Sequence, residues 1–239
     1  MTFSERIRTS RNRADVIGGD RAWFKFENKG DSTDIQLYNE IGFFGVTAQE
    51  FVAELRNVST RSIDLHVNSP GGDVFDGIAI HNALKQHPAK VNVIVDGIAA
   101  SIASVIAMAG DSIRMAGGSL MMIHEPFAMV IGDATDMRKS AEALDVMGDS
   151  IAGIYAQRAG GEVEAWRAVM REETWYSAEA AMKAGLADEV FDSLPAKNTF
   201  DLSIFRNAPK PVVPDPEPVP VPDWRRSAQL QVAAALLEV

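Results

Sequence analysis

The pattern of apolar and polar residues changes between two periods along the chain, and the two periods predict an alternating order of strands and helices. Short apolar or alternating stretches predict strands at 22–26, 34–38, 63–67, 91–95, 112–115, 120–123 and 187–191. Helical spacing predicts helices at 47–55, 76–86, 101–109, 134–158, 162–170 and 178–184. Thr47 and Glu50 have the spacing of a capping box at the start of the first helix. This order predicts an α/β fold with a largely parallel sheet.

The stretch 91–110 carries the most specific chemical signal. It predicts a buried strand, a tight turn of small residues at 97–100, and an apolar helix that begins at Ser101. Ser101 has alanines around it, so a substrate has room beside its hydroxyl. The unpaired amides at the start of the helix, Ile102 first, favour negative charge that develops there. A serine nucleophile needs this geometry.

Two further features are expected at the same edge of the sheet, where open α/β sheets bind their ligands. A glycine turn, Ser69-Pro70-Gly71-Gly72, follows one predicted strand, and His124 follows another. Acyl transfer needs a nucleophile, a base and oxyanion donors, and Ser101, His124 and the amides of Gly72 and Ile102 fit these roles. Each also has a plain structural interpretation, as a helix cap, a buried histidine or an ordinary turn. The other histidines, His66, His81 and His87, are interpreted as structural or surface residues.

Composition limits the chemistry further. The 239 residues are enough for one domain of about 150–200 residues with tails. The net charge of −10 argues against nucleic-acid and anionic-membrane partners. The absence of cysteine excludes a thiol nucleophile, a disulfide and a thiolate zinc site. No metal or organic cofactor is expected.

The predicted organisation has four parts. We expect residues 1–20 to form a flexible arm, 21–193 the α/β domain that carries Ser101 and His124, 194–222 a proline-rich acidic linker, and 223–239 a short amphipathic helical segment. The apolar stripe of the long helix at 134–158 leaves two interpretations open. It packs on its own domain, or it projects and meets a partner subunit.

Four stretches, VNSPGGDVFDGIAIHNAL, DGIAASIASVIAMAG, MMIHEPFA and YSAEAAMKAGLADEV, resemble the Clp proteolytic subunit family of serine peptidases. They occur in the family's order and nearly its spacing, over about residues 34–192. The resemblance implies a ClpP/crotonase-like fold, a repeated β-β-α superhelix with a protruding long handle helix. It implies that Ser101 is the nucleophile, His124 the general base, and Gly72 and Ile102 the oxyanion hole. Gly71, Pro126 and Phe127 are the expected substrate-binding residues.

The third catalytic residue is where the chain departs from the family, which usually has an aspartate shortly before the S-A-x-E-A motif. Glu173 occupies that position, and its longer side chain requires a backbone slightly farther from the histidine. Glu172 is its rival. Asp133 and Asp136 are weaker candidates, interpreted as a turn residue and a helix-start charge.

The departures also indicate a branch of the family. Residues 1–46 show no match to the part of the housekeeping enzyme that docks an unfoldase, and EETWYSAEAA with the proline-rich extension resembles the Clp-like head maturation proteases of tailed bacteriophages. We therefore expect an enzyme that cleaves scaffold or capsid proteins inside the assembling prohead, in the host cytoplasm. The alternatives are a host-type Clp subunit with an ATP-dependent unfoldase, a crotonase-like acyl-CoA enzyme, and an inactive ring-forming protein. The family forms paired seven-membered rings through its long helix, so the resemblance also implies a homo-oligomer.

Overall fold

The computed structural model describes residues 24–42, 45–192 and 200–209 of the chain. Contacts divide the chain into two units, residues 1–208 and 209–239. The expected arm at 1–20, the helical segment at 223–239 and most of the expected linker lie outside the described residues. The sheet, the helices and the candidate site all belong to the first unit.

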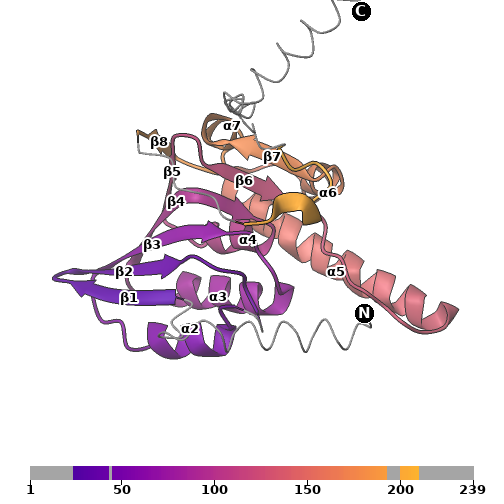
Figure 1. Ribbon diagram of the computed structural model, residues 1–239, viewed down its shortest axis with the longest axis horizontal. Helices are drawn as coiled ribbons and strands as arrows, with labels where there is room; N and C mark the ends of the chain where they lie inside the picture. Colours follow the sequence, from indigo (N-terminus) through magenta and orange to yellow (C-terminus); the bar gives the residue numbers. More distant parts are fainter. Residues whose placement is uncertain (1–23, 43–44, 193–199, 210–239) are drawn as a thin grey trace, which may run out of the picture. The chain divides into compact units, whose positions relative to one another are not determined.

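A mixed sheet forms the framework of this unit (Figure 1). Its strands are β1 (Phe24–Lys29), β2 (Ser32–Leu37), β3 (Ser62–Ser69), β4 (Lys90–Ala100), β5 (Ser112–Ala116), β6 (Leu120–Ile123), β7 (Thr174–Ser177) and β8 (Glu189–Phe191). The spatial order is β1-β2-β3-β4-β5-β8, and β6 pairs with the end of β4 and with β7. The pairs β1–β2 and β6–β7 are antiparallel and the other pairs are parallel. The expected α/β fold with a largely parallel sheet is confirmed.

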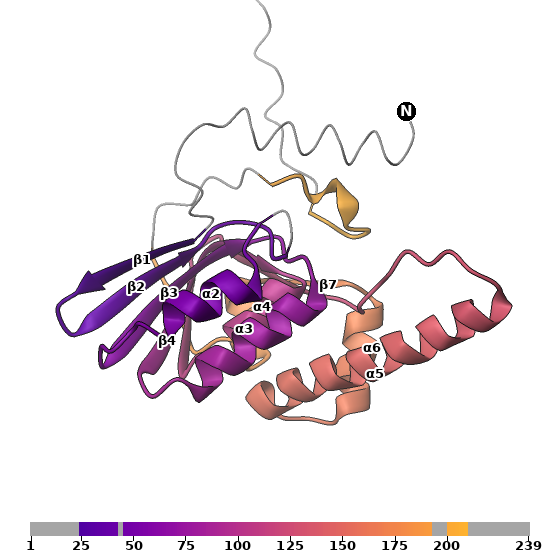
Figure 2. The ribbon, with the colours of Figure 1, turned by 90° about the horizontal axis from the view of Figure 1, so that it is seen from below.

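Helices cover one face of the sheet and extend beside it (Figure 2). They are α2 (Ala48–Leu55), α3 (Val74–Gln86), α4 (Ile102–Ala107), α5 (Ala134–Ala159), α6 (Val163–Arg171) and α7 (Ala178–Lys183), with a 3₁₀ turn, η1, at Leu202–Ile204. Thr47 caps α2 as predicted, and its hydroxyl accepts the amide of Glu50. None of the described helices is long and apolar enough to cross a membrane.

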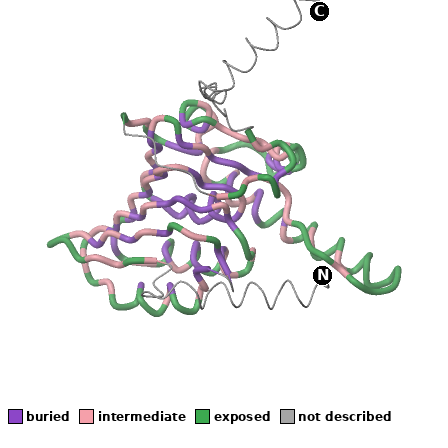
Figure 3. Tube along the Cα trace, in the orientation of Figure 1, coloured by how far each residue is buried: buried purple, intermediate pink, exposed green. Residues whose placement is uncertain are grey.

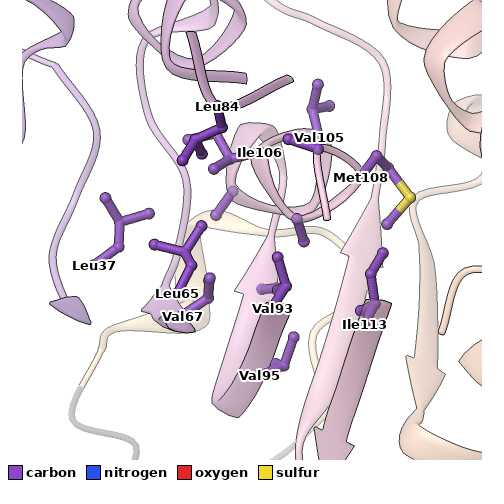
Figure 4. Packing of buried hydrophobic residues seen from close by; sticks show 14 of the residues in the cluster. Leu37, Leu65, Val67, Leu84, Val93, Val95, Val105, Ile106, Met108 and Ile113 are labelled. Atoms are coloured by element: carbon purple, nitrogen blue, oxygen red, sulfur yellow. The ribbon is translucent and has the colours of Figure 1, made fainter. Parts of the chain in front are cut away.

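The core lies between the sheet and helices α2, α3 and α4. Leu65 and Val67 of β3 and Val93 and Val95 of β4 are fully buried and point toward α4 (Figure 4). The residues that alternate with them along the two strands are only half-buried, and most of them are polar: Asp64, His66, Asn92, Ile94 and Asp96. This alternation gives the sheet one apolar and one polar face, as a period of two requires.

The predicted tight turn at 97–100 is wrong, because β4 continues to Ala100. Its first half pairs with β5, and Ile98, Ala99 and Ala100 pair with β6. These last residues are fully buried on both faces of the strand, since Ala99 belongs to the main core and Ile98 and Ala100 to a second apolar cluster. The small side chains that suggested a turn are therefore those of a strand covered from both sides.

The long helix α5 has two different halves. It begins with a capping box between Asp133 and Asp136, so the interpretation of these carboxylates as turn and helix-start residues is confirmed. Its first three turns are mostly exposed and extend beyond the sheet (Figures 1 and 3). The buried positions, Gly148, Ile151, Ala152 and Tyr155, all lie in the second half.

Arg167 of α6 fastens α5 to the segment that carries His124. Its side chain is 7% exposed and pairs with Glu125, Asp145 and Asp149. The helices approach so closely there that a Cβ on Gly148 would lie 2.7 Å from the Arg167 guanidinium carbon.

Replacing Arg167 with alanine is expected to lower the free energy of unfolding by about 2 kcal/mol, because it removes the main donor to the half-buried carboxylate of Glu125. Urea unfolding followed by circular dichroism measures this change. Arg171→Ala is the matched control, since Arg171 is half-exposed and an exposed ion pair contributes about 0–1 kcal/mol. Equal stability losses in the two variants would contradict the role given to Arg167.

Candidate active site

Ser101 lies at the junction of β4 and α4 in a strained backbone conformation. Its φ is 54° and its ψ is −130°, values that a residue with a side chain rarely adopts and that cost about 1–3 kcal/mol. Hydrogen bonds hold it there: the Ser101 amide donates to Met122 O at 2.9 Å, and the Ser104 hydroxyl donates to Ser101 O at 2.5 Å. Buried Tyr155 contacts that hydroxyl at 2.7 Å. The strain thus occurs where the hydroxyl is presented at the end of the strand.

His124 lies next to Ser101 because of the strand register. Ala100 of β4 is paired with Met122 of β6, so the residues that follow each strand meet at one edge of the sheet. The distance between Ser101 Oγ and His124 Nε2 is 2.7 Å. Burial lowers the pKa of His124, while the negative charge of Glu173 opposes that shift. The imidazole is therefore kept neutral and in contact with a hydroxyl whose proton it is able to accept.

The glycine turn packs directly against Ser101. Gly71 and Gly72 have φ values of 96° and 144°. A Cβ on Gly71 would lie 2.6 Å from Ser101 Cβ, and a Cβ on Gly72 only 2.0 Å from Ile41 O. Ile41 fixes the turn, since its amide donates to Gly71 O and its carbonyl accepts the Asp73 amide. The Gly72 amide makes no hydrogen bond to another described residue, and the Ile102 amide, first in α4, has no acceptor within the helix.

Glu173 lies between α6 and β7 with a left-handed φ of 49°. Its carboxylate accepts the amides of Arg206 at 2.8 Å and Asn207 at 2.5 Å, and the Trp175 indole N–H at 3.3 Å. Partial burial acts to raise the pKa of Glu173, but these donors and the nearby His124 outweigh it and the pKa is lowered. Within the described residues the carboxylate makes no hydrogen bond to His124. Glu172 is exposed, and its main-chain carbonyl accepts the Asn207 side chain.

Similarity to known proteins identifies the family to which this chain belongs. The family model for Clp protease matches residues 26–194. The chain belongs to the Clp protease family. This chain is therefore a serine-type endopeptidase. The family match does not support the alternative of a crotonase-like acyl-CoA enzyme.

Curated relatives and a solved structure agree with this assignment. ATP-dependent Clp protease proteolytic subunits from Deinococcus radiodurans and Rhodococcus jostii are 32% and 35% identical over 68% and 56% of this chain, and 78% and 67% of their own length. Subunit 1 from Prochlorococcus marinus is 28% identical over 64% of this chain and 81% of its own. A ClpP1 variant from Listeria monocytogenes has a TM-score of 0.60 at 23% identity, covering 67% of this chain and 91% of its own. That structure supports the expected fold.

The Ser101–His124 pair lies beside a cavity of about 730 Å³. Ser101, His124, Gly71 and Gly72 line it, and so do the expected substrate-binding residues Pro126 and Phe127. Its other apolar lining residues include Val74, Phe75, Leu144, Met147, Ile204 and Phe205. A neighbouring cavity of about 460 Å³ adjoins His124 and Glu173. The larger cavity therefore combines the Ser101 hydroxyl with mostly apolar walls, whereas the smaller one is lined by several charged residues.

The segment from Phe200 to Ala208 is part of the site, although its sequence was interpreted as a linker. It lies within the expected linker, yet it packs on the peptidase domain and lines both cavities. Its own pattern, Phe-Asp-Leu-Ser-Ile-Phe, is a signal that was available, because apolar residues recur at 200, 202, 204 and 205 before the first proline. The histidines outside the site have structural partners: His66 contacts Asp96 at 2.8 Å, and His81 is buried in α3. No cluster of three or more metal-ligating side chains occurs in the described part of the chain.

Proposed function

We propose that Ser101, His124 and Glu173 are the catalytic triad of this Clp protease. The contact of 2.7 Å between Ser101 Oγ and His124 Nε2, inside a cavity wide enough for a peptide, carries this proposal. Ser101 Oγ attacks the substrate carbonyl carbon while its proton passes to His124 Nε2. The proton then goes to the leaving amine, and water hydrolyses the acyl-enzyme by the same base. The amides of Gly72 and Ile102 donate hydrogen bonds to the oxyanion.

Glu173 is proposed to orient His124 and to stabilise the imidazolium that forms during each proton transfer. Its carboxylate adjoins the same cavity as His124 and interacts with it electrostatically. An ionised carboxylate has about four acceptor positions, and three donors occupy it here, so one position is left for the imidazole Nδ1–H. Glu172 lacks this proximity, because it is exposed and does not line the cavity.

The pH dependence of kcat/KM is expected to reflect the lowered pKa of His124. A general base is active when neutral, so the acid limb should lie below the ordinary histidine value of about 6.5. Glu173→Gln removes the charge that favours the imidazolium, and the limb should then move to still lower pH. Peptide hydrolysis from pH 4 to 9 measures both, with His87→Ala as the control. A limb above 6.5 in the wild type, or an upward shift in Glu173→Gln, would contradict this assignment.

For the biological role we propose maturation of a bacteriophage head, in which the enzyme cleaves scaffold or capsid proteins in the host cytoplasm. The glutamate at position 173 and the proline-rich extension at 209–224 support this branch. The curated relatives are ATP-dependent Clp protease proteolytic subunits, and this favours a second role, that of a proteolytic subunit that acts with an ATP-dependent unfoldase. In either role we propose a homo-oligomer of heptameric rings, with α5 in the contact between rings, because the first half of α5 is exposed in the single chain.

Substrate choice separates the two roles. The purified enzyme is incubated without ATP with the scaffold and head proteins encoded beside it, and the products are mapped by mass spectrometry. Cleavage at defined sites, lost in Ser101→Ala, is the result expected for head maturation. If the enzyme leaves the scaffold and head proteins uncut and degrades folded proteins only when an unfoldase and ATP are added, the result would support the second role and contradict the first.

A further inference from the structure

The segment Phe200–Ala208, here called the strap, covers the face of the sheet opposite α4 (Figure 2, yellow). It contains η1 and continues to Ala208 at the end of the first unit. Phe205 is 8% exposed and packs in the second apolar cluster with Ile98, Ala100 and Met122. Those three residues belong to the strand ends that precede Ser101 and His124. The strap is thus anchored on the strands that position the nucleophile and the base.

The strap also contacts both residues proposed to act with Ser101. The Phe205 ring meets the His124 imidazole edge-on at a centroid distance of 5.7 Å, and it packs in the same way on Trp175. The next two residues, Arg206 and Asn207, donate their backbone amides to the two oxygens of the Glu173 carboxylate. The Asn207 side chain donates to Glu172 O at 2.7 Å. Three consecutive residues therefore hold the base and the carboxylate together.

These contacts restrict the orientation of the Glu173 carboxylate and of the His124 imidazole. Two amides on a carboxylate favour its ionised form and fix the plane of the group. The backbone of Glu173 has a left-handed φ of 49°, a strained conformation that persists only where surrounding contacts hold it. Phe205 excludes water from His124, and burial is the cause of the lowered pKa of this imidazole.

We propose that the strap is a working part of the catalytic site, in which Arg206 and Asn207 position Glu173 through their amides and Phe205 positions and desolvates His124. This inference rests on the proposed triad. Arg206, Asn207 and Phe205 are positioning residues, since their groups act through Glu173 and His124. The peptidase domain of this chain accordingly extends to Ala208.

The first test removes one amide. Asn207→Pro lacks the N–H that reaches Glu173, whereas Asn207→Ala keeps it and loses only the bond to Glu172 O. In full-length protein, the rate at which a fluorophosphonate phosphonylates Ser101 Oγ, with loss of fluoride, is expected to fall roughly tenfold in Asn207→Pro and to stay within about twofold in Asn207→Ala. In the Glu173→Gln background the proline substitution should have little further effect, because it acts through that carboxylate.

The second test measures how the rate of the same phosphonylation of Ser101 depends on pH. Phe205→Ala lets water reach His124, so the pKa of His124 should rise and the acid limb should move to higher pH. Leu202→Ala is the control, since Leu202 lies in the same strap but lines neither cavity and makes no ring contact with His124. This measurement is independent of whether Asn207→Pro folds, and circular dichroism reports the folding of each variant.

The possible results distinguish an error in the proposed triad from an error in the proposed role of the strap. Absence of labelling at Ser101 in the wild type would overturn the proposed triad itself. Normal labelling in the wild type, with strap variants that react at the same rate and with the same pH profile, would overturn only the role of the strap. Faster labelling in Asn207→Pro would also overturn it, because the amides would then be withholding Glu173 from His124.

Discussion

Ser101→Ala is expected to reduce peptide hydrolysis by roughly four to six orders of magnitude, because no other described hydroxyl contacts His124. His124→Ala should cost a similar amount. The double variant should be little worse than either single variant, since the two residues carry out one proton transfer together and their effects are not additive. Steady-state hydrolysis of a fluorogenic peptide, with limits set by enzyme concentration, measures all three.

Ser150→Ala is the matched control for these losses. Ser150 is an exposed serine of α5 whose hydroxyl bonds only to the Val146 carbonyl, so activity should be unchanged. Retention of more than about one hundredth of the wild-type rate in folded Ser101→Ala would contradict a serine mechanism at this position.

Gly72→Ala is expected to have the second largest effect, a loss in kcat of about 10²–10³-fold. The new Cβ would lie 2.0 Å from Ile41 O, and φ at this position is 144°, so the turn has to move. The amide proposed to donate to the oxyanion moves with it, and a preorganised donor that is misplaced no longer stabilises the transition state. Pre-steady-state hydrolysis separates this loss in acylation from a change in binding.

A second glycine serves as the control for backbone strain alone. Gly118 also has a positive φ, 84°, but a Cβ there would meet nothing within 4 Å. Gly118→Ala should therefore lose some stability and keep its kcat. Equal losses of kcat in the two variants would show that the effect at Gly72 is one of folding and not of the oxyanion.

The sequence predicted that Ser101 and His124 lie at the same edge of the sheet, and the structure brings them into contact there, because both signals are local. Ser101 and His124 each follow an apolar strand, and residues that follow parallel neighbours meet at one edge of a sheet. The turn before Ser101 was predicted wrongly for a related reason. Small buried residues such as Ala99 and Ala100 favour a turn when read alone, and only the pairing with β6 shows that they are strand.

The strap and β7 illustrate what local patterns do not determine. Thr174–Ser177 is a strand because it pairs with β6, some fifty residues earlier in the chain. Phe205 is buried because Ile98, Ala100 and Met122 leave an apolar surface on the outer face of the sheet. Both depend on contacts between distant segments, and a proline-rich stretch immediately after the strap makes its sequence look like a linker.

The most direct test of the serine mechanism is reaction of the purified full-length protein with a fluorophosphonate, with the adduct mapped by mass spectrometry. Wild-type protein should carry the label on Ser101, and both Ser101→Ala and His124→Ala should remain unlabelled. Labelling that persists in Ser101→Ala, or a folded wild-type protein that carries no label on Ser101, would contradict it.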